Sequence, residues 1–372
     1  MDLTFDRRQV NRGLSLLMLC SLLGLGYVFL KASARETIDA LRHVRPAYLL
    51  LLGALTFIDL WLGGIRNHIF LRHMKPGISS WLSFRANLAN IFVGSITPSQ
   101  SGGGPGQLYV LWRGGVPISG AIATSVLNFL ATLTFFIVTV PAVLYFGLKS
   151  EQFSTGIWLF IGYAFIIFGF LLLLFFVSLA KPQWLESLVR ALHARSVGSS
   201  SKRGKLILSG AERLLSGFQN YRKHTSFFLA QDRKTLWLTI FLTLILYWNK
   251  YNIAYVVIAG LGHTRGYFDV ILLQNLQLFL IYFAPTPGAS GLAEISAASL
   301  MRSQVPVHVM PLFAMLWRTF TVYLGVVLGG VGLWKELRGK RAVKSEQEVV
   351  AAAVNSGQEA VGGIGWRSSE SG

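Results

Sequence analysis

Long apolar runs dominate this sequence, and most of them are close to the length that crosses a bilayer. Six such runs cover about residues 14–30, 47–65, 119–146, 155–179, 234–260 and 309–333. A helix needs roughly 20 apolar residues to span the hydrocarbon core, so each run predicts a transmembrane helix. The fold class expected from the pattern is therefore an all-α polytopic membrane protein with about six full spans.

Two further apolar segments, about 81–97 and 267–284, each end in a stretch rich in Gly and Pro. The first stretch reads TPSQSGGGPG (97–106) and the second TPGASGLAE (286–294). Such residues do not continue a helix, and a broken backbone is costly in lipid unless protein or water shields it. Each break is therefore either an ordinary surface loop or an unwound segment within the membrane.

Composition supports a membrane protein. Of 372 residues, 53% are hydrophobic and only 13% are charged, whereas soluble proteins carry about 25% charged residues. The run at 14–30 is longer than a signal-peptide core, so we expect it to be retained as a span. The lone Cys20 excludes an intrachain disulfide, and the seven His show no metal-binding spacing. We expect no metal and no cofactor.

Lysine and arginine predict the orientation. The formal net charge is +18, and residues 181–234 hold eleven Lys and Arg against three acidic residues. Basic loops mark the cytoplasmic side. The protein is therefore expected in the cytoplasmic (inner) membrane, with its N-terminus, this loop and its C-terminus in the cytoplasm. No aromatic-basic recognition module is present, so nucleic acid is not an expected partner.

Within the basic loop, apolar stripes at 184–192 and 207–221 predict two amphipathic helices, which either lie on the anionic inner leaflet or cap the bundle. The transmembrane domain is expected to cover 1–340, followed by a disordered tail at 341–372 that is rich in Ala, Gly and Ser. This orientation is consistent only if 81–117 and 267–303 each enter and leave on one side. Both segments are thus expected to be re-entrant hairpins.

The two breaks also match each other at an offset of 189 residues. Eight of 21 positions are identical, and the shared pattern is T-P-x-x-S-G, ten residues, R, two residues, V-P (97–117 and 286–306). The first hairpin is expected to open to the cytoplasm and the second to the outside. Segments 47–146 and 234–333 then form an inverted repeat, an architecture in which broken helices meet near the midplane at a transporter's substrate site.

The breaks are therefore the candidate binding site, with no catalytic residue expected. Glycines let a ligand approach the backbone, and the N–H groups at the start of each following helix favour an anion. Tight hairpin turns packed only for shape are the alternative. The candidate substrate-binding residues are Thr97, Pro98, Ser101, Gly102, Gly103, Gly104, Gln107, Arg113, Thr286, Pro287, Ser290, Gly291, Glu294, Arg302 and Arg318.

Charged residues in apolar segments usually face a cavity or a partner, because isolated charges at the bilayer centre cost about 2.5–3.5 kcal/mol. Arg318 lies near the middle of its run, and Glu294 follows the second break. Arg318 or Arg113 is expected to pair with Glu294. The arginines are candidate anion partners, and a purely structural ion pair is the alternative. Arg85 and Lys250 fit equally well as side chains that reach the interface.

The two breaks resemble the lysylphosphatidylglycerol synthase transmembrane-region family, also called the flippase-like domain family. The resemblance is to I-T-P-x-Q-x-G-G-G-P-x-Q-x-Y-V-L at 96–111 and P-T-P-G-x-x-G-x-x-E at 285–294, and it extends to about residue 340. Members fused to a soluble synthase domain are associated with moving aminoacylated phospholipid between leaflets. The sequence shows no such domain, so it is similar to the stand-alone members, and lipid aminoacylation is not implied.

The expected function is that of a lipid translocase, or a carrier of a similar amphipathic anionic substrate, with membrane lipids as partners. The alternative is a membrane-embedded enzyme or an accessory factor of glycolipid or cell-envelope synthesis. A cluster of carboxylates that converges in the fold would favour the enzyme, and a cavity open laterally to lipid would favour the translocase. Neither the substrate, the direction and energy source of transport, nor the oligomeric state follows from the sequence.

Overall fold

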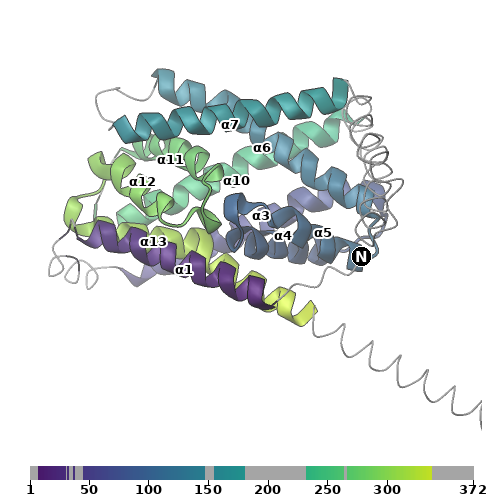
Figure 1. The fold of residues 1–372 in the computed structure, drawn as a ribbon, viewed down its shortest axis with the longest axis horizontal. Helices are drawn as coiled ribbons and strands as arrows, with labels where there is room; N and C mark the ends of the chain where they lie inside the picture. Colours follow the sequence, from purple (N-terminus) through teal and green to yellow (C-terminus); the bar gives the residue numbers. More distant parts are fainter. Residues whose placement is uncertain are drawn as a thin grey trace, which may run out of the picture.

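A computed structural model describes residues 7–30, 32, 37, 45–146, 155–180, 232–263 and 266–336, and the structural statements below concern these residues. Every long element in them is a helix, which confirms the all-α membrane fold (Figure 1). The helices are α1 (Arg7–Phe29), α3 (Pro46–Met74), α4 (Ser80–Ser95), α5 (Gly103–Arg113), α6 (Ile118–Phe146), α7 (Thr155–Ala180), α10 (Arg233–Gly260), α11 (Tyr267–Tyr282), α12 (Leu292–Leu300) and α13 (Met310–Arg318).

Four helices are long and apolar enough to cross a membrane: Val10–Phe29, Pro46–Met74, Ile118–Tyr145 and Val307–Glu336. The last of these contains α13, the π-helical segment η6 (Thr319–Tyr323) and a helical continuation to residue 336. The runs expected at 155–179 and 234–260 form α7 and α10, of 26 and 28 residues. Most of the basic loop, and the tail at 341–372, lie outside the described residues.

The span expected at 47–65 is too short, because α3 continues to Met74. In the sequence, the charged residue Arg66 ends the apolar run. In the fold, Arg66 is part of α3 and is buried. His68 and His73, which follow Arg66 in the sequence, also belong to α3. The helix can carry the charge of Arg66 because neighbouring helices, rather than lipid, cover this side chain.

The 189-residue offset is present in the backbone as well as in the sequence. The first break contains a short 3-10 turn, η1 (Pro98–Gln100), and the second contains its counterpart, η3 (Pro287–Ala289). The φ angles of Ser99 and Gly288 are 51° and 54°, and those of Gln100 and Ala289 are 54° and 58°. Each turn joins two helices, α4 to α5 and α11 to α12, so the unit helix, break, helix occurs twice.

The two halves run in opposite directions. Tyr48, near the start of α3, packs against Gly260 at the end of α10. Asp59 and Lys250 pair in the middle of the two helices, and His73 pairs with Asp232 at the other end. These contacts make α3 and α10 antiparallel neighbours, as an inverted repeat requires.

The two hairpins open at opposite ends of the bundle. At the open end of the first hairpin, Arg113 contacts Glu336, the last described residue of the final long helix. At the open end of the second, the chain enters the same helix through η5 (Val307–Val309). One helix of 30 residues therefore separates the two openings. Helix rise places each break about 13–24 Å from its own opening, at the closed end of its hairpin.

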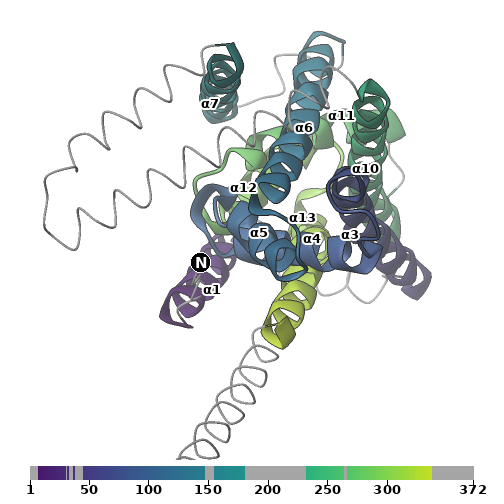
Figure 2. The ribbon, with the colours of Figure 1, turned by 90° about the vertical axis from the view of Figure 1, so that its right-hand side faces the viewer.

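The breaks contact each other through η1 and η3, which places residues 97–102 beside 286–291. Viewed along the helices, α4, α5, α12 and α13 gather around them, whereas α1 and α7 lie at the edge (Figure 2). The largest apolar core is formed between α6, α10, α11, α12 and α13, with aromatic rings such as Phe136, Phe279 and Trp317.

Candidate functional site

The first break is a polar turn on the protein surface. Its exposed residues are Pro98, Ser99, Gln100 and Ser101, although one helix precedes the turn in the sequence and another follows it. The hydroxyl of Thr97 accepts a hydrogen bond from the Gly102 N–H at 2.8 Å and donates to the Val93 carbonyl at 2.8 Å. The turn is thus held by its own backbone and leaves its polar surface accessible.

The second break has the same left-handed turn and the opposite environment. Pro287, Gly288, Ala289 and Ser290 are all buried. The Thr286 hydroxyl, the counterpart of Thr97, is buried without a hydrogen-bond partner. The two breaks therefore differ in solvent exposure: the first is exposed and the second is buried.

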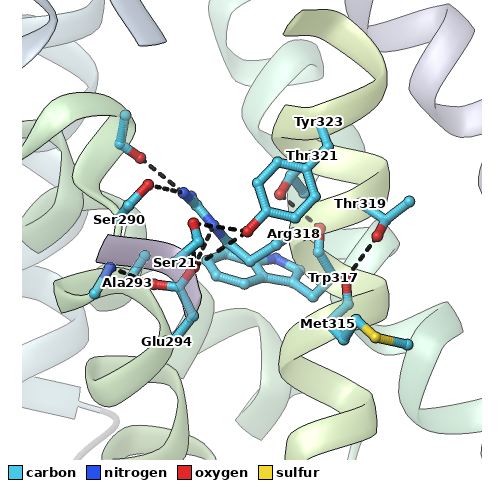
Figure 3. Close-up of polar contacts among 12 residues, drawn as sticks. Ser21, Ser290, Ala293, Glu294, Met315, Trp317, Arg318, Thr319, Thr321 and Tyr323 are labelled. Carbon is cyan, nitrogen blue, oxygen red and sulfur yellow. Dashed lines mark hydrogen bonds and ion pairs between the residues drawn. The ribbon is translucent and has the colours of Figure 1, made fainter. Parts of the chain in front are cut away.

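A buried ion pair holds the second break (Figure 3). Arg318 is 1% exposed and Glu294 is 0% exposed, and the Arg318 Nε donates to the Glu294 Oε1 at 3.1 Å. The Arg318 Nη2 also donates to the Gly288 carbonyl at 2.9 Å and to the Ser290 hydroxyl at 3.3 Å. Of the two pairings expected from the sequence, the structure therefore forms Arg318–Glu294.

Glu294 has further partners. Its Oε2 accepts from the Gly291 N–H at 2.7 Å, at the first turn of α12. Its Oε1 accepts from Ser21 at 3.3 Å, and Tyr323 in the π-helical segment donates to Ser21 at 2.8 Å. The segment η6 breaks the regular helix ladder, and Thr56 of α3 donates to the Phe320 carbonyl there at 2.9 Å. Both partners of the ion pair thus have further hydrogen bonds, as a stable buried pair requires.

Helix α1 crosses both breaks. A methyl group on Gly13 would lie 2.3 Å from the Ile96 carbonyl oxygen, and one on Gly24 would lie 2.8 Å from the Gly291 Cα. Only glycine permits backbones to approach this closely. This role of α1 was not predicted from the sequence. The signal was present, because the buried positions 13, 17, 21, 24 and 28 form a stripe rich in small residues, and such stripes are a sign of helix packing.

The first hairpin is held by amides where the second has its ion pair. Gln107 accepts from Asn90 at 3.0 Å and donates to Asn67 at 3.2 Å and to Ser125 at 3.1 Å. Asn128 donates to the same Asn67 oxygen at 2.8 Å. At the 189-residue offset, Phe129 corresponds to Arg318 and Pro105 corresponds to Glu294, so the charged pair has no counterpart in the first repeat.

Most of the candidate site residues meet at the breaks, but two arginines do not. Arg113 lies at the far end of α5, where it contacts Glu336 together with Arg85. Arg302 is exposed in η4 (Met301–Ser303), beyond α12. Each is ten residues past the start of its helix, which places it about 15 Å from the break. The structure therefore places both arginines at the hairpin openings.

Replacing Ser99 with glycine is expected to stabilise the protein by about 1 kcal/mol, because a left-handed conformation costs a residue with a Cβ about 1–2 kcal/mol. Ser101→Gly is the matched control. Ser101 has a φ of −60°, so its replacement relieves no strain and is expected to be neutral or destabilising. Unfolding in mixed micelles, followed by tryptophan fluorescence, measures both. Equal effects of the two substitutions would show that Ser99 is not strained.

Comparison with known proteins gives a consistent result. The family model described as "Lysylphosphatidylglycerol synthase TM region" matches residues 13–329. A relative named "UPF0104 membrane protein", from Archaeoglobus fulgidus, is 26% identical over 315 residues, which is 80% of this chain and 89% of that protein. The matched region includes both breaks, both hairpins and most of α1. The chain is a multi-pass membrane protein that belongs to the lysylphosphatidylglycerol synthase transmembrane-region family.

Proposed function

We propose that this protein is a translocase that moves lipids with an anionic headgroup across a cytoplasmic membrane, or carries a closely similar amphipathic anion. The headgroup enters at the first break and passes between the two repeats. The acyl chains stay in the surrounding bilayer. The protein requires no cofactor for this step, and membrane lipids are its partners.

The observation that carries the proposal is the exposure of the first break. A lipid-facing surface deep in a membrane bundle does not tolerate unwound backbone or exposed polar side chains, since the hydrocarbon offers them no hydrogen bonds. Gln100 and Ser101 are exposed polar residues at the closed end of a hairpin whose arms are about 16 and 24 Å long by helix rise. A site that opens laterally to water or to lipid headgroups satisfies them, and such a site is what a lipid translocase needs.

The environments of the two breaks support different roles for them. The second break is fixed by Glu294, Arg318 and α1, so it provides a rigid wall. The first break is held by neutral amides, which exchange partners at lower cost than an ion pair does. The first break is therefore the side at which substrate binds, and the second is its support.

The carboxylates of the interior favour a translocase over an enzyme. In the described part of the chain, Asp59 pairs with Lys250, and Glu294 pairs with Arg318. These two pairs lie on different helices and do not share a partner. An enzyme that uses a pair of carboxylates as acid and base needs them to converge on one substrate, and this interior keeps Asp59 and Glu294 in separate ion pairs.

The proposed orientation predicts opposite labelling of the two hairpin openings. In a Cys20→Ser background, Ser80→Cys at the first opening is expected to react with an impermeant maleimide only after the cells are permeabilised. Ser303→Cys at the second opening is expected to react in intact cells. Both residues are exposed, so accessibility to water does not differ between them. Labelling of both variants from the same side would refute the inverted repeat.

Native mass spectrometry of the purified protein tests the substrate class. We expect anionic phospholipid to be retained in excess of its share in the membrane, and Gln100→Leu to lower the retained amount. Ser303→Leu, an equally exposed substitution at the second opening, is the control and is expected to retain as much lipid as the wild type. Retention that reflects only the lipid composition of the membrane would contradict the proposal.

A further inference from the structure

Arg66 is a buried cation without an ionic partner. The charged side chains that are buried in the described residues are Asp59, Arg66, Glu294 and Arg318. The other three form ion pairs, two with each other and one with Lys250. Arg66 is 8% exposed and forms no ion pair with any described carboxylate. Among the described residues, no carboxylate therefore forms an ion pair that would neutralise its charge.

The guanidinium of Arg66 is positioned but only partly used. Its Nη2 donates to the Asn128 carbonyl at 2.7 Å and to the Thr132 hydroxyl at 3.2 Å, both on α6. Its Nε is buried and has no hydrogen-bond partner, and the same is true of the Asn128 Oδ1. A donor and an acceptor on two contacting residues are thus both unsatisfied. Buried polar groups are normally paired, so this combination indicates a ligand.

Arg66 contacts a line of polar residues along α6, the α6 stripe. Ser125, Asn128 and Thr132 follow one another at helical spacing, and Thr139 comes two turns after Thr132, past the core residues Phe135 and Phe136. Each of the four polar residues contacts a polar side chain of another helix. The partners are Gln107 of α5, Asn67 and Arg66 of α3, and Asn275 of α11. Helix rise gives the stripe a length of about 21 Å. It begins beside the helix that follows the first break and continues between the two repeats.

Further polar side chains interact with Arg66. Tyr247 and Tyr282, from α10 and the end of α11, lie close enough to interact electrostatically with the guanidinium, and Asp59 does so from two turns away on α3. Asp59 is already paired with Lys250 at 2.7 Å. The local sum of Asp59, Lys250 and Arg66 is one positive charge, which matches one phosphate diester.

We propose that Arg66 binds the phosphate of the lipid headgroup as it moves along the α6 stripe. The guanidinium offers its Nε–H to a phosphate oxygen, and the Asn128 Oδ1 accepts from a hydroxyl of the headgroup. The inference rests on the proposed function, because it assigns the anion-binding residue of that same pathway. It differs from the sequence-based candidates in placing the cation on α3 and not at the second break.

Calorimetric titration of purified protein in a zwitterionic detergent tests the assignment. The probes are short-chain phosphatidylglycerol, short-chain phosphatidylcholine and inorganic phosphate. Wild-type protein is expected to bind phosphatidylglycerol, and Arg66→Gln is expected to weaken that binding at least about tenfold, in line with the loss of a charge-assisted hydrogen bond. Arg66→Lys keeps the charge without the fork and is expected to lie between them. Arg12→Gln removes an exposed cation of α1 and is expected to bind like the wild type.

A second measurement separates binding from folding. Because Arg66 is an uncompensated buried charge, Arg66→Gln is expected to unfold at the same temperature as the wild type or at a higher one. Unchanged binding by Arg66→Gln overturns the inference, and so does a loss of stability or failure to fold. Binding of inorganic phosphate as tight as that of phosphatidylglycerol, and equally dependent on Arg66, would assign the site to a free anion. If the wild type binds no anionic lipid at all, it is the proposed function that fails.

Discussion

Replacing Arg318 with methionine is expected to lower the free energy of unfolding by about 3–5 kcal/mol, because it leaves a carboxylate buried without its cation. Glu294 is 0% exposed, and the Arg318 Nε at 3.1 Å supplies its positive partner. The variant also loses the bonds from Arg318 to Gly288 and Ser290, which fix the second break. Unfolding in mixed micelles measures the change.

The double variant Arg318→Met, Glu294→Gln provides the control. It removes both charges together, so it is expected to be more stable than Arg318→Met alone, with a coupling energy of at least about 1 kcal/mol. Arg318→Lys keeps the charge but lacks the planar guanidinium fork that spans Glu294 and the Gly288 carbonyl, and it is expected to fall between the wild type and Arg318→Met. A coupling near zero would mean that the pair does not stabilise the break. Lipid binding lost in Arg318→Lys without any loss of stability would instead place Arg318 in the substrate site.

Gly24→Ala is expected to destabilise the protein by about 1–3 kcal/mol, the usual cost of overpacking a tight contact. Its methyl group would lie 2.8 Å from the Gly291 Cα and 3.1 Å from the Gly291 carbonyl, and these backbone atoms cannot rotate away. Gly13→Ala, whose methyl group would lie 2.3 Å from the Ile96 carbonyl oxygen, is expected to cost at least as much. Both changes push α1 off the breaks, so they are also expected to lower the retention of anionic lipid.

Gly26 is the matched control on the same helix, because a methyl group there meets nothing within 4 Å. Gly26→Ala is expected to stabilise α1 by about 0.5–1 kcal/mol through helix propensity alone. Unfolding of the three variants side by side checks the account. If Gly24→Ala and Gly26→Ala behave alike, α1 does not seal the second break, and the enclosure of that break must come from other helices.

The breaks could be predicted from the sequence because their cause is local. A cluster of proline and glycine disfavours a helix through its own backbone chemistry, so the offset from Thr97 to Thr286 is found again between η1 and η3. The pairing of Arg318 with Glu294 was also within reach, since two opposite charges within apolar segments of one repeat have few other partners. The all-α membrane fold and the family followed from the same features.

The rest depended on contacts between segments that are distant in the sequence. Hydropathy does not separate a polar residue that ends a span from one that faces the inside of a bundle, so Arg66 seemed to end its span and was missed. Arg113 and Arg302 follow the breaks closely in sequence, but ten helical residues carry them about 15 Å away. The packing of α1 against both breaks joins positions 13 and 24 to residues far along the chain.

The most direct test of the central claim is the movement of lipid across the membrane of sealed proteoliposomes. Phosphatidylglycerol that carries a fluorophore on one acyl chain is placed in both leaflets. Albumin, which does not cross the membrane, extracts the labelled lipid from the outer leaflet. The extraction is followed with and without an imposed proton gradient. Wild-type protein is expected to make the inner-leaflet pool extractable, Arg66→Gln is expected to slow this movement, and Arg12→Gln is expected to leave it unchanged. If the inner-leaflet pool stays as protected with wild-type protein as in protein-free vesicles under both conditions, the protein is not a translocase of this lipid class.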